Sequence, residues 1–268
     1  MRIPPAARRV LDPLTERCPV PIITGPNRGR WWSAVSAGSG YASGRRAREQ
    51  MELFGSLMSP GDCVWDIGAH HGYVTLLASA RVGPTGAVVA FEPDRRNGRI
   101  LLRHVRWNRA RNVDVRHCAL SDFTGTAPFG GGPTSKMHSL GDGCETVTVC
   151  SGASLVTSGQ LRAPTVVKID AEGAEGSVVA GMLSVLPADV VLLIAMHHAS
   201  ADRHCVEQLT DAGFRLLPSP ALTRARRADW RGDPDLLCLG PGFRDDGRVQ
   251  RVIAAGLFDA AESGTGAR

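Results

Sequence analysis

Short apolar runs alternate with helical segments along most of this chain, and no other feature constrains its fold as strongly. From about residue 62 onward, each run ends in a turn and a helical pattern follows it. That alternation predicts a mainly parallel β-sheet with helices on both faces. The predicted strands are 63–67, 87–91, 113–120, 146–150, 165–169 and 190–196, and the predicted helices are 47–58, 72–80, 94–107, 175–186 and 202–212.

The end of the pattern differs from the rest. Two late apolar runs, 214–217 and 236–239, read as short strands with no helix predicted between them, and they predict an antiparallel strand at one edge of the sheet. The segment 123–137 is dense in Gly, Thr and Pro and is expected to form a loop or a hairpin. The expected fold class is therefore α/β, with a mostly parallel sheet and an antiparallel edge strand.

Three parts of the chain can be separated by composition. Residues 46–245 carry the alternation and form the main domain, 1–45 form an N-terminal extension, and 246–268 form a polar C-terminal tail. Trp31 and Trp32 stand out in the extension, because two tryptophans in a polar leader usually cover something apolar. They either pack the extension on the main domain or form part of a lid.

Charge and cysteine content narrow the class of protein. The 268 residues hold 31 Lys and Arg against 26 Asp and Glu, and a formal charge of +5 does not argue for a nucleic-acid partner. The seven cysteines are scattered and form no C-x-x-C pair, which indicates a reduced protein. No apolar stretch reaches the ~18 residues that a membrane span needs. Pro4, Pro5 and Pro13 interrupt the basic start, so we expect no signal peptide and a cytoplasmic location.

The first motif that carries chemistry is Asp66-Ile67-Gly68-Ala69-His70-His71-Gly72. It begins on a predicted strand and ends entering a predicted helix, whose N-terminus lies behind the two glycines. Gly68 and Gly72 let the backbone approach a ligand closely, although such turns also serve packing alone. The pyrophosphate fingerprint G-x-G-x-x-G is absent, and an acid before the first glycine suits a cationic or amine-bearing ligand.

The second motif, Phe91-Glu92-Pro93, ends the next predicted strand. An acid at that position can accept hydrogen bonds from both hydroxyls of a ribose, or can merely cap the following turn. Both motifs lie at carboxyl ends of adjacent parallel strands, where open α/β sheets bind ligands, so together they are a much stronger signal than either alone.

The third motif crowds carboxylates between a strand and a helix, in the sequence Lys168-Ile169-Asp170-Ala171-Glu172-Gly173-Ala174-Glu175. Helix capping by Asp170 or Glu172 would explain one of the three acids. Crowded carboxylates often have perturbed pKa values, which favours a functional site for the rest.

With this third motif the sequence resembles the FkbM family of methyltransferases, from about Gly61 to Met196 and more weakly to about Gly240. The resemblance implies a class I methyltransferase (Rossmann-like) fold for residues 46–245, S-adenosylmethionine as cofactor, and usually a hydroxyl oxygen as methyl acceptor. Asp170, Glu172 and Glu175 match the family's acidic signature, and Ala119-Leu120-Ser121-Asp122 matches its stretch near the adenine. The predicted cofactor-binding residues are Asp66, Gly68, His70, Gly72, Glu92, Pro93, Ala119, Leu120 and Asp170.

Two positions depart from the family pattern. His70 stands where the family usually has Asn, within the cofactor loop. Ala195 stands where the family often has an acid, two residues before the histidine that matches His197. The second change removes a carboxylate from the predicted acceptor pocket.

Histidines add a candidate base. His197 and His198 follow the strand 190–196 and face the same end of the sheet. His197, with an ordinary pKa of about 6.5, could remove the acceptor proton or could simply orient the substrate. No metal site is expected, because the histidine pairs are adjacent and no zinc-type spacing occurs. The histidines weighed for a metal were His70, His71, His197, His198 and His204.

Arginines give weaker signals. Those of the predicted helix 94–107 are expected to form a solvated face. The loop that carries Arg224, Arg226, Arg227 and Trp230 could contact an anionic or sugar acceptor, or could be a mobile surface loop.

We therefore expect an S-adenosylmethionine-dependent methyltransferase with Asp170, Glu172 and His197 as its catalytic residues. The expected acceptor is a sugar, a lipid or a secondary metabolite. A nicotinamide-dependent oxidoreductase and a non-catalytic protein that binds S-adenosylmethionine are the two alternatives, and a homodimer is left open.

Overall fold

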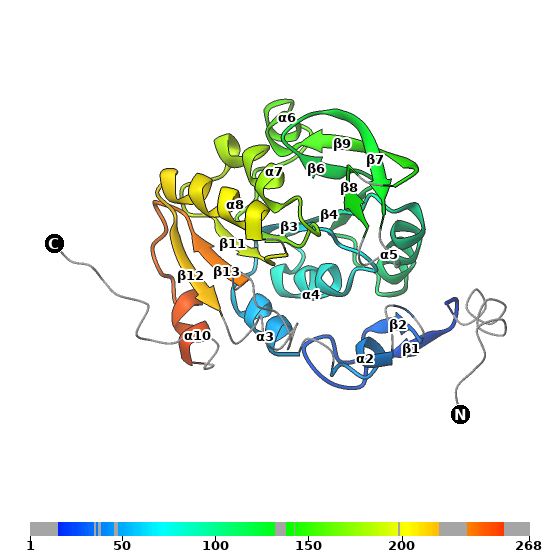
Figure 1. Ribbon diagram of the computed structural model, residues 1–268. Coiled ribbons are helices and arrows are strands. Elements are labelled where there is room, and N and C mark those ends of the chain that lie inside the picture. The colour runs from blue at the N-terminus through cyan, green and yellow to red at the C-terminus, as the bar shows by residue number, and fades with distance from the viewer. Residues whose placement is uncertain are drawn as a thin grey trace.

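A seven-stranded sheet forms the centre of the molecule (Figure 1). The computed structural model describes residues 16–34, 36, 39–45, 48–131, 138–141, 143–197, 199–219 and 235–254. Across the sheet the strands follow the order β12-β13-β11-β10-β3-β4-β5. Their bounds are β3 Cys63–Ile67, β4 Ala87–Phe91, β5 Val113–Arg116, β10 Val166–Ile169, β11 Val191–Ile194, β12 Arg215–Ser219 and β13 Asp235–Leu239.

The direction of the strands confirms the expected mostly parallel α/β sheet. Strands β5, β4, β3, β10 and β11 pair in parallel, whereas β13 runs antiparallel to both β11 and β12. The reversed strand β13 therefore lies one position in from the edge, and β12 is the edge strand. β12 and β13 follow one another among the described strands and pair directly, from Arg215 with Leu239 to Ser219 with Asp235.

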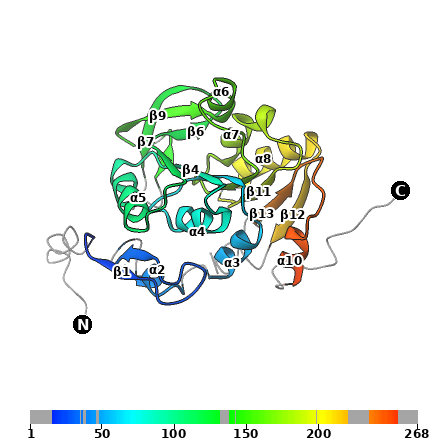
Figure 2. The same ribbon diagram turned by 180° about the vertical axis from the view of Figure 1, so that it is seen from behind.

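Helices cover both faces of the sheet, as the alternation predicts. Along β3 and β4, Val64 and Val88 face one layer and Trp65 and Val89 face the other, because successive side chains of a strand point to opposite sides. The first layer holds α3 Arg48–Ser56, α4 Tyr73–Val82, α5 Arg95–Trp107 and α10 Arg248–Ala254, and the second holds α6 Gly152–Thr157, α7 Glu175–Ala180, the 3₁₀ turn Leu183–Val185 and α8 Ala199–Asp211 (Figures 1 and 2).

A second, four-stranded sheet contains the last residues of the predicted strand 113–120. The stretch 113–120 is not continuous, because the chain leaves the central sheet after Arg116. Leu120 then packs in the apolar cluster on one face of that sheet, with Trp65 and Phe91, so the backbone must turn out of the sheet's plane. The order of the small sheet is β6-β9-β7-β8, with bounds β6 Ala119–Ser121, β7 Gly125–Gly130, β8 Ser139–Leu140 and β9 Glu145–Ser151.

The N-terminal segment packs on the first helical layer. Its described parts are the antiparallel pair β1 Pro19–Pro21 and β2 Trp31–Ser33, followed by α2 Ser39–Ala42. Trp32 is fully buried and stacks on the His104 ring of α5 at a centroid distance of 3.9 Å, while Trp31 is 45% exposed. The Ser33 N–H donates to His104 Nε2 over 3.0 Å, and His104 Nδ1 bonds the carbonyl oxygen of His71 over 2.8 Å. One buried imidazole thus joins this segment to the loop before α4.

That arrangement makes the stability of the fold pH-dependent. Burial lowers the pKa of His104 to about 4, and the charge of Arg103 acts in the same direction, while the bond to the His71 carbonyl opposes them. In the fold, Nε2 is unprotonated because it accepts from the Ser33 N–H. The unfolded chain binds this proton near pH 6.5, so stability is full above that pH and is lost as the pH falls toward 4. We expect a loss of about 3 kcal/mol by pH 4.

Urea unfolding of the wild type and of His104→Gln between pH 7 and pH 4 measures this effect. The variant should show the smaller pH dependence, and His204→Gln, at an exposed histidine of α8, should behave like the wild type. Equal pH dependence in wild type and His104→Gln would remove His104 as the cause.

The C-terminal stretch differs from the expected polar tail. It begins with helix α10, in which Val249 and Val252 are buried in the apolar cluster beneath the sheet. Arg248 adds an ion pair to Asp62, with Nη1 3.1 Å from Oδ2. A helix forms here because two valines three residues apart lie on one helical face. Among the residues that the structure describes, none of the helices has the length and apolar character to span a bilayer.

Candidate functional site

Four adjacent parallel strands end level with one another, which brings the three sequence motifs to one edge. In register, Ile67 of β3 is paired with Phe91 of β4 and with Ile169 of β10, and Ile169 is paired with Ile194 of β11. The residues that follow these strands therefore share the carboxyl end of the sheet, which is where open α/β sheets bind ligands.

The loop after β3 approaches the turn after β10 very closely. Gly68 has a φ of +72°, and a Cβ built on it would lie 2.0 Å from the carbonyl oxygen of Asp170. Only glycine fits there, because both the backbone angle and the space exclude a side chain. Gly72, at φ +85°, has no space for a side chain either, since a Cβ built on it would lie 2.1 Å from Leu101 Cδ1. The two glycines of the first motif thus fix the position of the loop between α5 and the acidic turn.

His70 occupies a left-handed conformation, with φ +50°. Asn and His are both enriched among the non-glycine residues that adopt this region. The backbone N–H of His70 donates to Glu92 Oε2 over 2.6 Å. The departure from Asn therefore leaves this contact in place, because the contact uses the backbone and not the side chain. The ring stacks on His71 at 3.9 Å.

Glu92 is buried and held by several donors. Its Oε1 accepts from the Asp94 N–H over 2.9 Å and from Asn97 Nδ2 over 3.4 Å, while Oε2 accepts from His70. Burial raises the pKa of Glu92 to about 7, although the hydrogen bonds from the backbone of Asp94 and His70 act in the opposite direction. Asp94, after Pro93, caps α5 by accepting from the N–H groups of Arg96 and Asn97. The side chain of Glu92 is thereby oriented before any ligand binds.

Lys168 links the first and third motifs. Its Nζ donates to the carbonyl oxygens of Gly68, over 2.8 Å, and Ile67, over 3.2 Å. The same nitrogen lies 3.3 Å from Asp66 Oδ1 and 3.6 Å from Asp170 Oδ2. Burial lowers the pKa of Lys168, but the charges of Asp66 and Asp170 outweigh burial and leave it raised. Asp66 is fully buried and its Oδ2 accepts from Thr75, so it supports the loop from below.

The predicted catalytic residues come together around one imidazole. His197, at the end of β11, is 2% exposed. Its Nε2 lies 3.3 Å from Asp170 Oδ1 and 3.5 Å from Glu172 Oε2. Its Nδ1 lies 2.8 Å from Oε1 of Glu175, which is fully buried. Burial lowers the pKa of His197, but hydrogen bonds and charges of Asp170 and Glu175 outweigh burial and raise it to about 10.

Glu175 is the acid that caps the turn. Its carboxylate accepts from the N–H groups of Ala171, over 3.0 Å, and Gly173, over 2.9 Å. One of Asp170 and Glu172 was expected to cap the helix, but the N-cap position of α7 belongs to Ala174, which makes no side-chain cap bond. The chain reaches that position through a left-handed φ of +49° at Glu172. Asp170 and Glu172 instead keep side chains that are about a third exposed, 32% and 30%.

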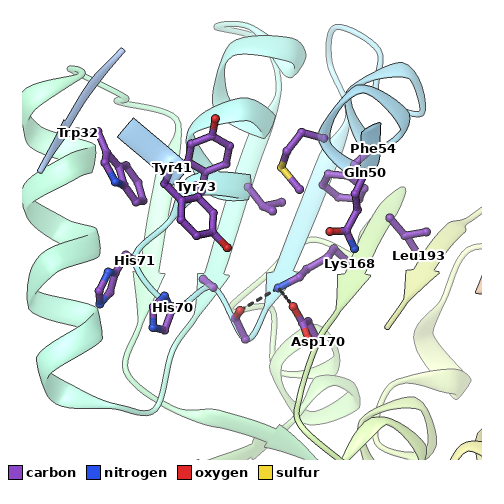
Figure 3. Close-up of a pocket in the computed structure, with 14 residues that line it drawn as sticks. Trp32, Tyr41, Gln50, Phe54, His70, His71, Tyr73, Lys168, Asp170 and Leu193 are labelled. Atoms are coloured by element: carbon purple, nitrogen blue, oxygen red, sulfur yellow. Dashed lines mark hydrogen bonds and ion pairs between the residues drawn. The ribbon is translucent and has the colours of Figure 1, made fainter. Parts of the chain in front are cut away.

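A pocket opens beside this cluster (Figure 3). Its lower wall in that view holds His70 of the loop together with Lys168 and Asp170. Gly68 of the same loop also lines the pocket. The opposite wall comes from the first helical layer and the N-terminal segment, with the side chains of Trp32, Tyr41, Gln50, Phe54 and Tyr73 among those that line it. Cofactor loop, acidic turn and N-terminal segment thus enclose one space.

Some predicted site residues lie apart from this pocket. Ala119 and Leu120 belong to β6 in the small sheet, and Leu120 is a buried core residue. Neither is among the residues that line the pocket, whereas Gly68, His70 and Asp170 do line it. The predicted site residues that also lie outside the lining are Asp66, Gly72, Glu92, Pro93, Glu172 and His197. Ala195 is buried, and its N–H donates to the Ile169 carbonyl oxygen. His198, Arg224, Arg226, Arg227 and Trp230 lie outside the described residues.

Sequence reasoning missed several contributors. Lys168 was not assigned a role, although a lysine inside a buried strand between acids is a signal of a paired charge. Asn97, which contacts both Glu92 and His71, follows the second motif by five residues and could have been considered with it. Tyr41, Gln50 and Phe54 carry no motif at all, so only the fold brings them to the pocket.

Comparison with known proteins agrees with this geometry. A family model described as the methyltransferase FkbM domain matches residues 66–216. The chain is similar to the hexuronic acid methyltransferase AglP of Haloferax volcanii, with 27% identity over 154 residues that cover 56% of this chain and 62% of that protein. The matched part therefore spans less than two thirds of that relative's length.

Two solved structures are also similar to this chain. The methyltransferase FkbM from Methylobacillus flagellatus has 21% identity and a TM-score of 0.48, covering 68% of this chain and 44% of that one. An O-methyltransferase from Bacillus cereus, in complex with SAH, has 11% identity and a TM-score of 0.48, covering 72% of this chain and 79% of that one.

Proposed function

The chain belongs to the FkbM methyltransferase family, and from that premise we propose that it transfers a methyl group to a hydroxyl oxygen of a small, sugar-like acceptor. The fold is the class I methyltransferase fold, and S-adenosylmethionine is the cofactor. One observation carries the proposal: the cluster of Asp170, Glu172 and His197 adjoins the cofactor loop, since Gly68 lies against the backbone of Asp170. The similarity to a hexuronic acid methyltransferase supports a sugar as the acceptor class.

The residues present fit this cofactor. Gly68 lines the pocket and lets the cofactor loop lie directly against the backbone of Asp170, where a Cβ would collide with the carbonyl oxygen. Glu92 offers an oriented carboxylate at a strand end, suited to the two hydroxyls of a ribose. Asp170, which lines the pocket, and Glu172, which lies with it around His197, supply negative charge that suits a cationic sulfur. When bound, S-adenosylmethionine supplies the electrophilic methyl group.

In the proposed mechanism, the chain's own residues align the acceptor and handle its proton. Lys168 holds Asp170 in place, and the walls of the pocket exclude water from the acceptor oxygen. The acceptor proton passes to the carboxylate pair Asp170 and Glu172 while the oxygen attacks the methyl carbon. The carbon–sulfur bond breaks, and its electron pair stays on sulfur.

Of the two roles left open for His197, we propose the orienting one. An imidazole whose pKa is about 10 is already protonated near neutral pH and has no lone pair to take a further proton. Its position between three carboxylates suits holding Asp170 at the pocket, with Glu172 beside it. The described part of the N-terminal segment is proposed to form the acceptor-side wall of the same pocket.

Methyl transfer can be measured directly. The purified chain is incubated with methyl-labelled S-adenosylmethionine and with glucuronate, galacturonate, their neutral sugars, or simple non-carbohydrate alcohols. We expect label on a sugar oxygen, identified by mass spectrometry. Glu172→Gln should lower kcat by about 100-fold with little change in the KM for S-adenosylmethionine, because it removes a proton acceptor and not a cofactor contact.

Glu145→Gln, at an exposed acid of β9, is the matched control and should keep the wild-type kcat. Tight binding of S-adenosylmethionine without transfer to any of these acceptors, or to the small-molecule fraction of a cell extract, would contradict the proposal. That result would favour a non-catalytic binding protein.

A further inference from the structure

Asp170, Glu172 and His197 form a set of metal-ligand atoms as well as an acid–base cluster. One ligand atom from each residue lies within 4.8 Å of the other two. Nε2 of His197 is 3.3 Å from Asp170 Oδ1 and 3.5 Å from Glu172 Oε2. Ligands that each lie about 2.0–2.2 Å from a common ion are themselves roughly 3 Å apart, so these atoms need to move little to share one ion.

The histidine of this set is oriented as a metal-binding histidine usually is. Its Nδ1 faces Glu175 Oε1 at 2.8 Å, which directs Nε2 at Asp170 and Glu172. Glu175 is fully buried and is itself fixed by the N–H groups of Ala171 and Gly173. A carboxylate behind the ligating imidazole sets the ring's tautomer and angle, and metal sites commonly keep such a partner.

Charge around the cluster favours a cation. Four carboxylates, those of Asp66, Asp170, Glu172 and Glu175, lie within direct contact of Lys168 or His197. The positive charge of Lys168 is shared between Asp66 and Asp170, with which it forms ion pairs. The side chains of Asp170, which lines the pocket, and Glu172 remain about a third exposed, which gives an ion access to them from solvent.

We propose that Asp170, Glu172 and His197 bind one divalent metal ion beside the acceptor pocket. One imidazole nitrogen and two carboxylate oxygens suit a first-row divalent ion such as Mn²⁺. The ion takes the place of the proton on Nε2, so His197 is the neutral imidazole in the metal-bound state and the imidazolium in the ion-free state. The spacing of histidines along the sequence gave no reason to expect a metal, because this set uses a single histidine and two acids from another segment. This inference revises that expectation.

The role of the metal ion rests on the proposed function, because the ion would activate the hydroxyl that accepts the methyl group. With the ion bound, Asp170 and Glu172 serve as its ligands, so an acceptor hydroxyl at the ion would have a lowered pKa and would give its proton to solvent water, in place of the carboxylate pair of the ion-free mechanism. The oxygen's electron pair then forms the bond to the methyl carbon, and the carbon–sulfur bond breaks onto sulfur. The ion also lets an acidic sugar approach, since its carboxylate would otherwise face Asp170 and Glu172.

Binding of Mn²⁺ to the purified full chain tests the site without any turnover. Free Mn²⁺ gives a strong electron paramagnetic resonance spectrum that weakens on binding, so a titration yields stoichiometry and affinity. We expect about one ion per chain. Asp170→Asn, Glu172→Gln and His197→Gln should each weaken binding by at least about tenfold, because even residues behind the ligands contribute that much.

Glu145→Gln and Asp114→Asn remove exposed acids from β9 and β5 and should leave Mn²⁺ binding unchanged. The titration of the wild type does not depend on whether any variant folds. The side chains of Asp170 and Glu172 are about a third exposed, so they can be substituted without disturbing the core. Absence of stoichiometric Mn²⁺ binding, or binding that survives all three substitutions, would overturn the inference.

Two further results separate this inference from the proposed function. Undiminished methyl transfer by protein shown to be metal-free would overturn the role of the ion and leave methyl transfer standing. Substitution-sensitive Mn²⁺ binding without transfer to any acceptor would support the metal site and contradict the proposed function.

Discussion

Gly68→Ala is expected to weaken S-adenosylmethionine binding by about 100-fold or more. The added Cβ would lie 2.0 Å from the carbonyl oxygen of Asp170, and backbone atoms cannot move aside as a flexible side chain can. The φ of +72° adds strain of about 1–3 kcal/mol for a residue with a side chain. Either the loop or the acidic turn must shift, and each shift moves a proposed cofactor contact.

The chain offers a close control for this substitution. Gly159 has the same φ of +72°, but a Cβ there meets nothing within 4 Å. Gly159→Ala therefore carries the backbone strain without the collision, at a position that follows α6 and does not line the pocket. Calorimetric titration with S-adenosylmethionine should show wild-type affinity for Gly159→Ala, and urea unfolding reports any general loss of stability. Equal affinities for the two variants would show that the close approach of Gly68 to Asp170 has no part in binding.

Lys168→Met should destabilise the fold by about 3–5 kcal/mol, because it leaves a buried carboxylate without its cation. Asp66 is fully buried, and its Oδ1 lies 3.3 Å from Lys168 Nζ. The substitution also leaves the carbonyl oxygens of Ile67 and Gly68 without this donor. The free energy of urea unfolding measures the loss.

A second substitution distinguishes charge from packing. Asp66→Asn in the Lys168→Met background removes the unpaired charge and should restore part of the stability. Arg48→Met breaks the exposed pair between Arg48 and Glu52, whose side chains are 60% and 45% exposed, and should cost less than about 1 kcal/mol. If Lys168→Met unfolds at the wild-type urea concentration, the buried pair does not stabilise this fold.

The sequence predicted the central sheet well, because buried parallel strands have a strong local signature. The runs 63–67 and 87–91 are apolar, short and followed by turns, and both are strands with those bounds. Parallel strands also place their carboxyl ends together, so the meeting of the Gly68 loop, Glu92 and Asp170 followed from topology alone. The prediction of 113–120 as one strand was wrong, since the burial of Leu120 turns the chain away, and the turn depends on distant residues.

The finer features of the site depend on contacts that no local pattern encodes. Which acid caps the turn is decided by the left-handed angle at Glu172, and three neighbouring acids look alike in sequence. The stacking of Trp32 on His104 joins residues more than seventy positions apart, and sequence spacing gives no hint of it. The role of His197 changes with the three carboxylates around it, two of which lie on another segment's turn.

Two stretches of the chain form the pocket, and the family match covers only one of them. The family match begins at residue 66, so it includes the cofactor loop and the acidic turn but leaves out Tyr41, Gln50 and Phe54 on the opposite wall. We therefore expect relatives that share every side chain of the reaction to diverge in what they methylate. If residues 39–56 are exchanged between two such relatives, acceptor preference should change with the exchanged segment. The catalytic residues, which lie outside that segment, would stay the same.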